Sequence, residues 1–168
     1  DSMAETAENV AIDYNVSRED QDQFALRSQQ KVAGAISHGR LKEEITQVEI
    51  MQRRGNPLVV DTDEHPRADS TIEGLQKLRP IARKAGTVTA GNASGINDGA
   101  CALLIASDDA GSKYGLTPIV RIVTWASAGV EPRVMGIGPV SASQKALSRA
   151  GLTIEQMDVI ELNEAFAA

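Results

Sequence analysis

The sequence predicts an α/β fold in which helices cover a parallel sheet. Unbroken apolar runs typical of buried strands occur at residues 100–106, 118–124 and 159–162. Helix signals separate them, at residues 107–114 and 141–150, and a glycine follows each. Strands alternating with helices indicate a parallel sheet, because parallel strands need a crossover connection that is usually a helix.

The composition favours a globular protein and counts against several other classes. With 168 residues and 42% hydrophobic content, the chain can bury a core in one domain or in parts of two. The net charge of −6 argues against general nucleic-acid binding. No apolar run approaches the ~20 residues of a membrane span, and the first residues are too polar for a signal peptide. The single Cys101 is expected to be a buried small hydrophobe, in a reducing compartment such as the cytoplasm.

Two helices are predicted near the start of the chain. Residues 6–14 place apolar side chains at helical spacing, and Asn15 is a plausible stop. These side chains are Ala7, Val10, Ala11 and Tyr14. Ser17 and Asp20 resemble a capping arrangement for a second helix that runs to Gly39. That helix should dock by one face only, since its stripe is narrow: Ala25, Ser28, Val32 and Ile36.

Two short strands are predicted next. Alternation over residues 46–50 suggests a half-buried strand, and the RGNP sequence at 54–57 supplies a turn before the extended residues 58–60. The following residues 61–67, DTDEHPR, combine three acids with His65, but their spacing fits neither an EF-hand nor a zinc site. No metal site is expected there.

A short helix with basic neighbours precedes the most informative stretch. Ile72, Leu75 and Leu78 predict the helix, and Pro80 should end it. Residues 67–84 carry five bases and two acids, a local charge of +3. An anionic small molecule could be held there, although a solvated helix face would carry the same charges.

The central stretch is residues 86–106, GTVTAGNASGINDGACALLIA. Thr87 to Thr89 favour an extended backbone. The small side chains of residues 90–95 let a ligand approach the main chain, although a crowded turn where two backbones cross would need the same residues. The stretch is not a phosphate loop, because no Lys followed by Ser or Thr closes it.

The remaining elements are predicted from caps and apolar faces. Ser107 can cap a helix through Tyr114, which Gly115 stops. Residues 130–139 form a connection rich in Gly and Pro, and residues 153–156 open a turn. The helix over 141–150 ends at Gly151 and has one apolar face made of Ala142, Ala146 and Leu147. A further helix is expected from Asn163, and the change at residues 116–118 is the candidate domain boundary.

Four ordered segments resemble the thiolase family. They are SMAETAENVA at Ser2, KLRP followed by GTVTAGNASGINDGA from Lys77 and Gly86, GPV at Gly138, and VIELNEAFAA at Val159. Within the family, DSMAETAENVA, DTDEHPR and GINDGACALL are most similar to bacterial β-ketoadipyl-CoA thiolases, which make succinyl-CoA and acetyl-CoA from 3-oxoadipyl-CoA and CoA. The resemblance leaves open acetoacetyl-CoA or a fatty 3-ketoacyl-CoA as the substrate.

The resemblance implies a five-layered α-β-α-β-α fold of two similar halves, with a loop domain that carries CoA. Residues 1–96 would be most of the loop domain, residues 97–117 the last strand and helix of the first half, and residues 118–168 the start of the second half. The chain would cover less than half of a typical member. CoA thioesters would be substrates, no cofactor would be permanently bound, and a homodimer or homotetramer is expected.

The resemblance also assigns site residues. Ser94 matches the loop serine that approaches the pantetheine of CoA, with Ala90 and Ala93 beside it. Arg67 matches the arginine at the nucleotide end, whereas Gly74 stands where some members have a serine near the adenine. The acyl and pantetheine channel would be lined by Met3 and Phe166.

Asn163 is the candidate catalytic residue by resemblance, because it matches the asparagine that holds a water in an oxyanion hole. Such a donor stabilises the enolate-like oxygen formed when the carbon–carbon bond breaks. Spacing alone favours a helix N-cap for Asn163, with Glu164 in the first turn, and the two roles are compatible.

The family's nucleophilic Cys and its catalytic His have no counterpart in this chain. Cys101 lies in the context of a structural strand, and neither His38 nor His65 lies in the Gly-His-Pro pattern of the family's catalytic histidine. We therefore expect the 168-residue chain alone to be inactive. It would be part of an acyltransferase, or alternatively a non-catalytic CoA-binding module.

Overall fold

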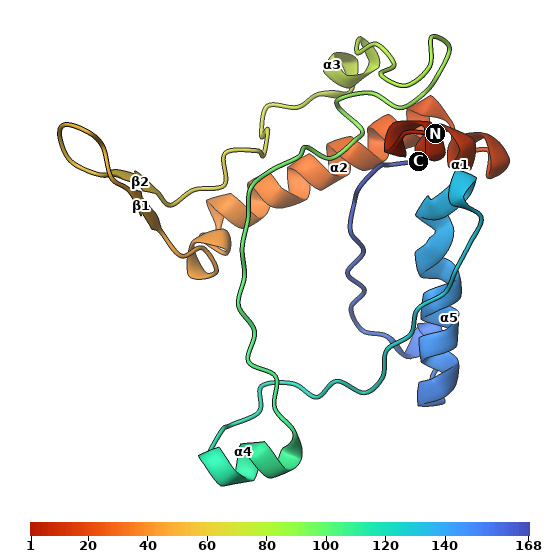
Figure 1. Ribbon diagram of the computed structural model, residues 1–168. Helices are drawn as coiled ribbons and strands as arrows, with labels where there is room; N and C mark the ends of the chain where they lie inside the picture. The colour runs from red at the N-terminus through yellow and green to blue at the C-terminus, as the bar shows by residue number, and fades with distance from the viewer. The chain divides into compact units, whose positions relative to one another are not determined.

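A computed structural model describes all residues 1–168 (Figure 1). The chain divides into two units, residues 1–95 with 163–168, and residues 96–162. In the first unit the last residues of the chain lie beside the N-terminal helices, as the N and C marks in Figure 1 show. None of the helices combines the length with the apolar composition that a membrane span requires.

Helix α1, Met3–Asp13, opens the first unit with a capping box. The Ser2 hydroxyl accepts a hydrogen bond from the Glu5 amide, and the Glu5 carboxylate accepts one from the Ser2 amide. The predicted buried face is confirmed for Ala7, Val10 and Ala11. It is wrong for Tyr14, which is exposed because the helix ends at Asp13 and the chain turns at Asn15 with a φ of 55°.

Helix α2, Arg18–Ser37, begins at the predicted Ser17 cap with Asp20 as its partner. Of the predicted stripe, Ala25 is buried but Ile36 is exposed. The best-buried positions are instead polar, Gln21 and Asp22. Asp22 accepts hydrogen bonds from Asn92 and Arg18, and the Gln21 NH₂ group donates to Thr87, whereas the Gln21 side-chain oxygen has no hydrogen-bond partner. A short 3₁₀ turn, η1 at Leu41–Glu43, follows the helix.

Strands β1 (Val48–Ile50) and β2 (Leu58–Val60) form an antiparallel hairpin. Both strands and the turn between them were predicted, and Gly55 supplies a positive φ of 91° in that turn. The predicted half-burial is wrong, since Val48 is 58% and Ile50 46% exposed and no further element covers the hairpin within the chain. Helix α3, Ile72–Gln76, is short and ends before Pro80 as expected.

The second unit confirms the predictions that rest on caps. Helix α4, Asp108–Tyr114, is capped by Ser107 and stopped by Gly115, whose φ is 62°. Helix α5, Gly138–Ala150, begins earlier than predicted because Pro139 fits the first turn of a helix. It ends at Gly151 as expected. Two 3₁₀ segments complete the unit, η2 at Pro132–Ile137 and η3 at Ile154–Gln156.

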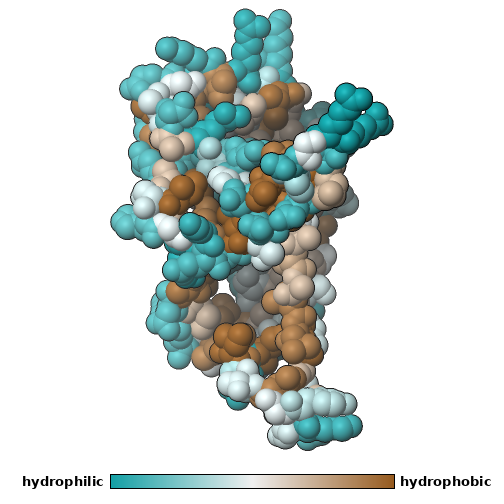
Figure 2. All heavy atoms as spheres, turned by 90° about the vertical axis from the view of Figure 1, so that its left-hand side faces the viewer, coloured by the Kyte–Doolittle hydropathy of each residue, from teal (hydrophilic) through white to brown (hydrophobic).

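The predicted parallel sheet does not form within this chain. Residues 100–106, 118–124 and 159–162 contain no strand, and Cys101 is exposed rather than buried. A strand needs a neighbour for its amides and carbonyls, and no segment of the chain pairs with these three. Their large apolar side chains are exposed, 83% at Leu103 and 96% at Ile119. Figure 2 shows apolar side chains at the surface, in brown.

Candidate functional site

The loop of small residues at 90–95 and the C-terminal segment, residues 163–168, lie side by side in the first unit. The Ser94 amide donates to the Ala165 carbonyl at 2.9 Å, and the Ala167 amide donates to the Asn92 carbonyl at 2.9 Å. Ala93 and Phe166 form an antiparallel bridge between these two bonds. The predicted helix from Asn163 is therefore wrong, because the segment uses its backbone groups for this pairing. The N-cap role considered for Asn163 falls with it.

The carboxylate of Glu8 fixes the start of the loop. Glu8 is 2% exposed and accepts hydrogen bonds from the amides of Thr87 and Val88 at 2.9 to 3.0 Å, and from the Thr87 hydroxyl at 3.1 Å. A Cβ at Gly86 would lie 2.1 Å from the Glu8 carboxylate. Glycine at position 86 therefore lets α1 bind the loop backbone directly.

The side chain of Asn92 fixes the middle of the loop. Its carbonyl oxygen accepts from the Thr89 amide at 2.7 Å, and its NH₂ group donates to the Thr87 carbonyl and to Asp22, both at 3.0 Å. Asp22 is fully buried and also accepts from Arg18 at 2.8 Å. These hydrogen bonds join α2 to the loop through buried polar groups. The buried charge of Asp22 is tolerated because Arg18 pairs with it and Asn92 donates a hydrogen bond to it.

Arg18 extends the same network to α3. Its guanidinium donates to the carbonyls of Leu75 and Leu78 at 2.8 and 3.0 Å. These two leucines lie against Gly91, where an added Cβ would approach their side chains to 2.5–2.6 Å. The loop is thus held from three helices, and its small residues permit close packing on one side as well as access on the other.

A cavity of about 300 Å³ adjoins the loop. We call it the loop cavity; α2, the loop, residues 63–66 and the C-terminal segment line it. Its residues are Phe24, Ala25, Ser28, Gln29, Val32, Asp63, His65, Pro66, Gly91, Asn92, Ala93, Ser94, Glu164 and Ala167. The Ser28 hydroxyl donates to Glu164 at 2.5 Å, which ties α2 to the C-terminal segment.

The lining of the loop cavity limits what it can accept. It contains two carboxylates, Asp63 and Glu164, and no Lys or Arg, so it disfavours phosphate groups. The cavity combines apolar side chains of α2 with polar groups of the other segments, which suits an uncharged ligand that has hydrogen-bonding groups. Its volume is at the lower end of the range for ligand pockets, roughly 300–1,000 Å³.

The structure brings together part of the predicted site. Ala93 and Ser94 line the loop cavity, and Phe166 is the bridge partner of Ala93. Ala90 and Asn163 are exposed, and Asn163 lies two residues before the carbonyl that Ser94 binds. The other two predicted residues are also exposed. Met3 is on the first turn of α1, and the Arg67 amide donates to Gln29 at 2.8 Å beside the cavity.

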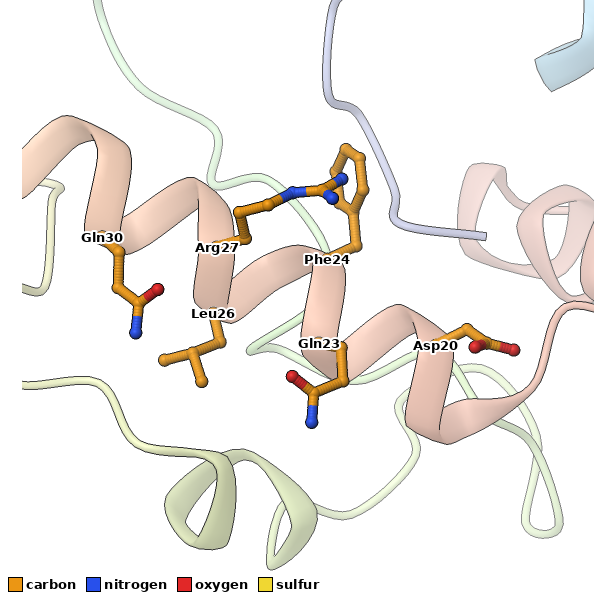
Figure 3. Close-up of a pocket in the computed structure, with 6 residues that line it drawn as sticks. All are labelled: Asp20, Gln23, Phe24, Leu26, Arg27 and Gln30. Atoms are coloured by element: carbon orange, nitrogen blue, oxygen red, sulfur yellow. The ribbon is translucent and has the colours of Figure 1, made fainter.

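A larger hollow, of about 440 Å³, lies along the outer face of α2 (Figure 3). All six residues that line it come from this one helix, and the guanidinium of Arg27 lies 5.3 Å from the centre of the Phe24 ring. No second element supplies groups that converge on it. We therefore place the candidate site at the loop cavity, where four segments meet.

The two histidines lie at the end of α2 and at the loop cavity. No group of three or more His, Cys, Asp or Glu side chains is arranged to hold a metal ion. The His38 ring lies 2.7 Å from the Gly34 carbonyl at the end of α2. His65 is exposed and lines the loop cavity.

The buried polar residues that hold the loop were missed by sequence reasoning. They are Glu8, Gln21, Asp22 and Asn92. A signal for Glu8 was present, because it lies next to Ala7 and one turn before Ala11 on a face otherwise expected to be apolar. A charge on such a face needs a partner, and the only candidates are segments distant in sequence.

Comparison with known proteins agrees with the resemblance. The family described as "Thiolase, N-terminal domain" matches residues 1–109, and the family described as "Thiolase, C-terminal domain" matches residues 116–168. The chain is 58% identical to the 3-oxoadipyl-CoA/3-oxo-5,6-dehydrosuberyl-CoA thiolase of Escherichia coli and 56% identical to a beta-ketoadipyl-CoA thiolase of Acinetobacter baylyi. Both similarities extend over all 168 residues but over 42% of each relative, so the chain spans less than half their length.

Solved structures match the fold. The chain resembles the acetyl-CoA acetyltransferase of Bacillus anthracis with a TM-score of 0.94 and 47% identity, over 98% of this chain and 42% of that one. It resembles human mitochondrial 3-ketoacyl-CoA thiolase in complex with CoA with a TM-score of 0.90 and 48% identity, over 98% and 40% of the two chains. These matches confirm the thiolase fold class, in part of its length, although this chain alone does not pair the predicted strands. The chain belongs to the thiolase family.

Proposed function

We propose that this chain is part of an enzyme that transfers an acyl group between CoA thioesters, converting 3-oxoadipyl-CoA and CoA to succinyl-CoA and acetyl-CoA. The bond between the α and β carbons breaks, the CoA sulfur joins the succinyl carbonyl carbon, and the thiol proton balances the new methyl group of acetyl-CoA. The names of the two relatives with 56% and 58% identity support this substrate. The observation that carries the proposal is the pairing of the loop at Ser94 with the segment that follows Asn163.

We assign the arm of CoA to the loop. Ser94 contacts the pantetheine chain, and Ala90 and Ala93 leave room for it. The pantetheine chain is neutral and contains amides, which agrees with a cavity that holds hydrogen-bonding groups but no cation. Arg67 is assigned to the phosphates of the nucleotide end, because it lies in the residues that follow the cavity wall at 63–66.

The acyl end is assigned to the C-terminal segment. Met3 and Phe166 line the acyl and pantetheine channel, and Asn163 holds a water that donates to the thioester oxygen. As the carbon–carbon bond breaks, negative charge gathers on that oxygen, and a donor already in position stabilises it without reorganisation. Loss of one such donor costs roughly 3 kcal/mol, or about 10²–10³ in rate.

The domain organisation and assembly are part of the same proposal. Residues 1–96 are assigned to the CoA-binding loop domain, 97–117 to the end of the first half and 118–168 to the start of the second. The exposed apolar residues of the second unit agree with strands that pair with further segments of a thiolase. We propose a cytoplasmic homodimer or homotetramer that acts on CoA thioesters and has no nucleic-acid or membrane partner.

The test uses the full-length protein, with 3-oxoadipyl-CoA and CoA as substrates and acetyl-CoA formation as the readout. We expect turnover that depends on both substrates and a kcat that falls about 10²–10³-fold in Asn163→Ala. A folded full-length protein that forms no acetyl-CoA from any 3-ketoacyl-CoA would contradict the proposal.

Acetoacetyl-CoA is the second candidate substrate, because the matched structure with a TM-score of 0.94 is an acetyl-CoA acetyltransferase. The ratio of kcat/KM values for 3-oxoadipyl-CoA, acetoacetyl-CoA and a long 3-ketoacyl-CoA decides between them. The dicarboxylate should be preferred at least tenfold if the assignment is right.

A further inference from the structure

Asn92 uses every polar group that it has. Its side chain binds Thr89, Thr87 and Asp22, its amide donates to the Thr89 carbonyl at 3.3 Å, and its carbonyl accepts from the Ala167 amide. The residue is 3% exposed. Two of its bonds cross long distances in the sequence, to α2 and to the C-terminal segment.

The bond to Ala167 depends on the orientation of the Asn92 peptide. That orientation is set by the side-chain hydrogen bonds, because the side-chain carboxamide of Asn92 binds Asp22 and also the backbone of Thr87 and Thr89. Asp22 in turn is held by Arg18, whose other contacts are the carbonyls at the end of α3. A chain of fixed groups therefore runs from α3 and α2 through Asn92 to the C-terminal segment.

The C-terminal segment has few other anchors. It is held by the Ser94–Ala165 bond, the Asn92–Ala167 bond and the hydrogen bond between Ser28 and Glu164. Asn163 lies two residues before Ala165, so their Cα atoms are no more than roughly 7 Å apart. A change in the backbone path of residues 165–167 therefore moves the Asn163 side chain.

We propose that Asn92 is a positioning residue for Asn163, and that it acts through the Asp22–Asn92–Ala167 connection. The inference rests on the proposed function, because it gives Asn163 its catalytic role. It assigns to Asn92 a function other than contact with substrate, because the residue fixes the position of Asn163 relative to the loop at residues 90–95.

The sharpest variant is Asn92→Asp in the full-length protein. It keeps the size and the acceptor for the Thr89 amide, but it places an oxygen 3.0 Å from the Asp22 carboxylate where the NH₂ group was. Two carboxylates at this distance repel, and a shared proton relieves the repulsion by restoring a hydrogen bond. The charged groups bonded next to the pair are Arg18, on Asp22, and Glu8, which binds the adjacent Thr87 and Val88. Asp63, His65 and Glu164 are the titratable groups that line the loop cavity together with Asn92.

The first readout is amide hydrogen exchange, which does not require activity. We expect exchange at Ala167 and Ser94 to be at least tenfold faster than in the unchanged protein at pH 8, and amides in the middle of α1 to stay within threefold. Asn56→Asp, on the exposed hairpin turn, is the matched control and should change neither. The exchanged pair Asp22→Asn/Asn92→Asp puts a donor back between the two positions and should recover at least part of the protection.

The second readout is kinetic. At pH 8 kcat should fall 10- to 100-fold in Asn92→Asp with KM for the CoA thioester within threefold, and the defect should shrink toward pH 6. Ala167 exchange within threefold of the unchanged protein overturns the inference, as does a loss of kcat no larger than the loss of folded protein. If the unchanged full-length protein shows no thiolase turnover, the proposed function fails, and the exchange result still decides whether Asn92 holds the segment.

Discussion

Replacing Glu8 by Gln tests whether a buried carboxylate holds the loop to α1. Glu8→Gln keeps the shape of the side chain, so packing changes little. It replaces one carboxylate oxygen by an NH₂ group, and that group faces amides of Thr87 and Val88, which are donors themselves. With the amide oxygen at the Oε1 position both N–H groups keep an acceptor, but the Thr87 N–H also faces the NH₂ group, and none of the hydrogen bonds is to a charged group any longer.

The magnitude follows from the contacts. A hydrogen bond to a charged group contributes about 1.5–3 kcal/mol and a neutral one about 0.5–1.5 kcal/mol, and the bonds of three donors to Glu8 lose the charge. Because part of the network survives, we expect a loss of about 2–4 kcal/mol in local stability of the loop. This corresponds to roughly 30- to 700-fold faster amide exchange at Thr87 and Val88, at 1.4 kcal/mol for each factor of ten.

The assay is hydrogen exchange of the full-length variant under conditions where exchange reports local opening. Glu49→Gln, on the exposed strand β1, is the control and should leave both amides unchanged. Exchange at Thr87 and Val88 within threefold of the unchanged protein would refute the reasoning, since the carboxylate would then contribute little to the loop.

Three further outcomes are expected. The hydrogen bond from the Ser2 amide is the main cause that holds the pKa of Glu5 below its ordinary value of 4.5. The ionised Glu5 carboxylate therefore stabilises α1 fully above pH 4.5, and this stabilisation is lost as the pH falls through the lowered pKa. Glu5→Gln should remove this part of the acid dependence when the stability of the helix is measured over a pH series. Gly86→Ala should speed exchange at Thr87 at least tenfold, because its Cβ would displace the Glu8 carboxylate, and unchanged exchange would contradict the contact. The 168-residue chain alone should form no acetyl-CoA from acetoacetyl-CoA or 3-oxoadipyl-CoA with CoA, and reproducible turnover would show that the family's missing Cys and His are not needed.

Local signals in the sequence predicted the helices well. The caps at Ser17 and Ser107 and the glycine stops at Gly115 and Gly151 all occur where expected, because a cap is decided by residues within one turn of it. The hairpin was also predicted, although its burial was not, since burial depends on what covers the strands.

Long-range features could not be obtained from local patterns. Residues 100–106 have the composition of a buried strand, but strand formation needs hydrogen-bonded neighbours, and the chain supplies none. The pairing of Ala93 with Phe166 joins residues far apart in sequence, and the resemblance, rather than any spacing, indicated that the loop and the segment after Asn163 act together. The network of Glu8, Asp22 and Asn92 was not predicted, because each bond joins distant segments.

The most direct test of the account is a crystal structure of the full-length protein with a bound CoA thioester. The account predicts that the pantetheine chain passes Ala90, Ala93 and Ser94, and that the thioester carbonyl lies within reach of a water held by Asn163. A thioester bound with its pantetheine chain away from this loop, or with Asn163 on the far side of the protein from its carbonyl, would contradict it.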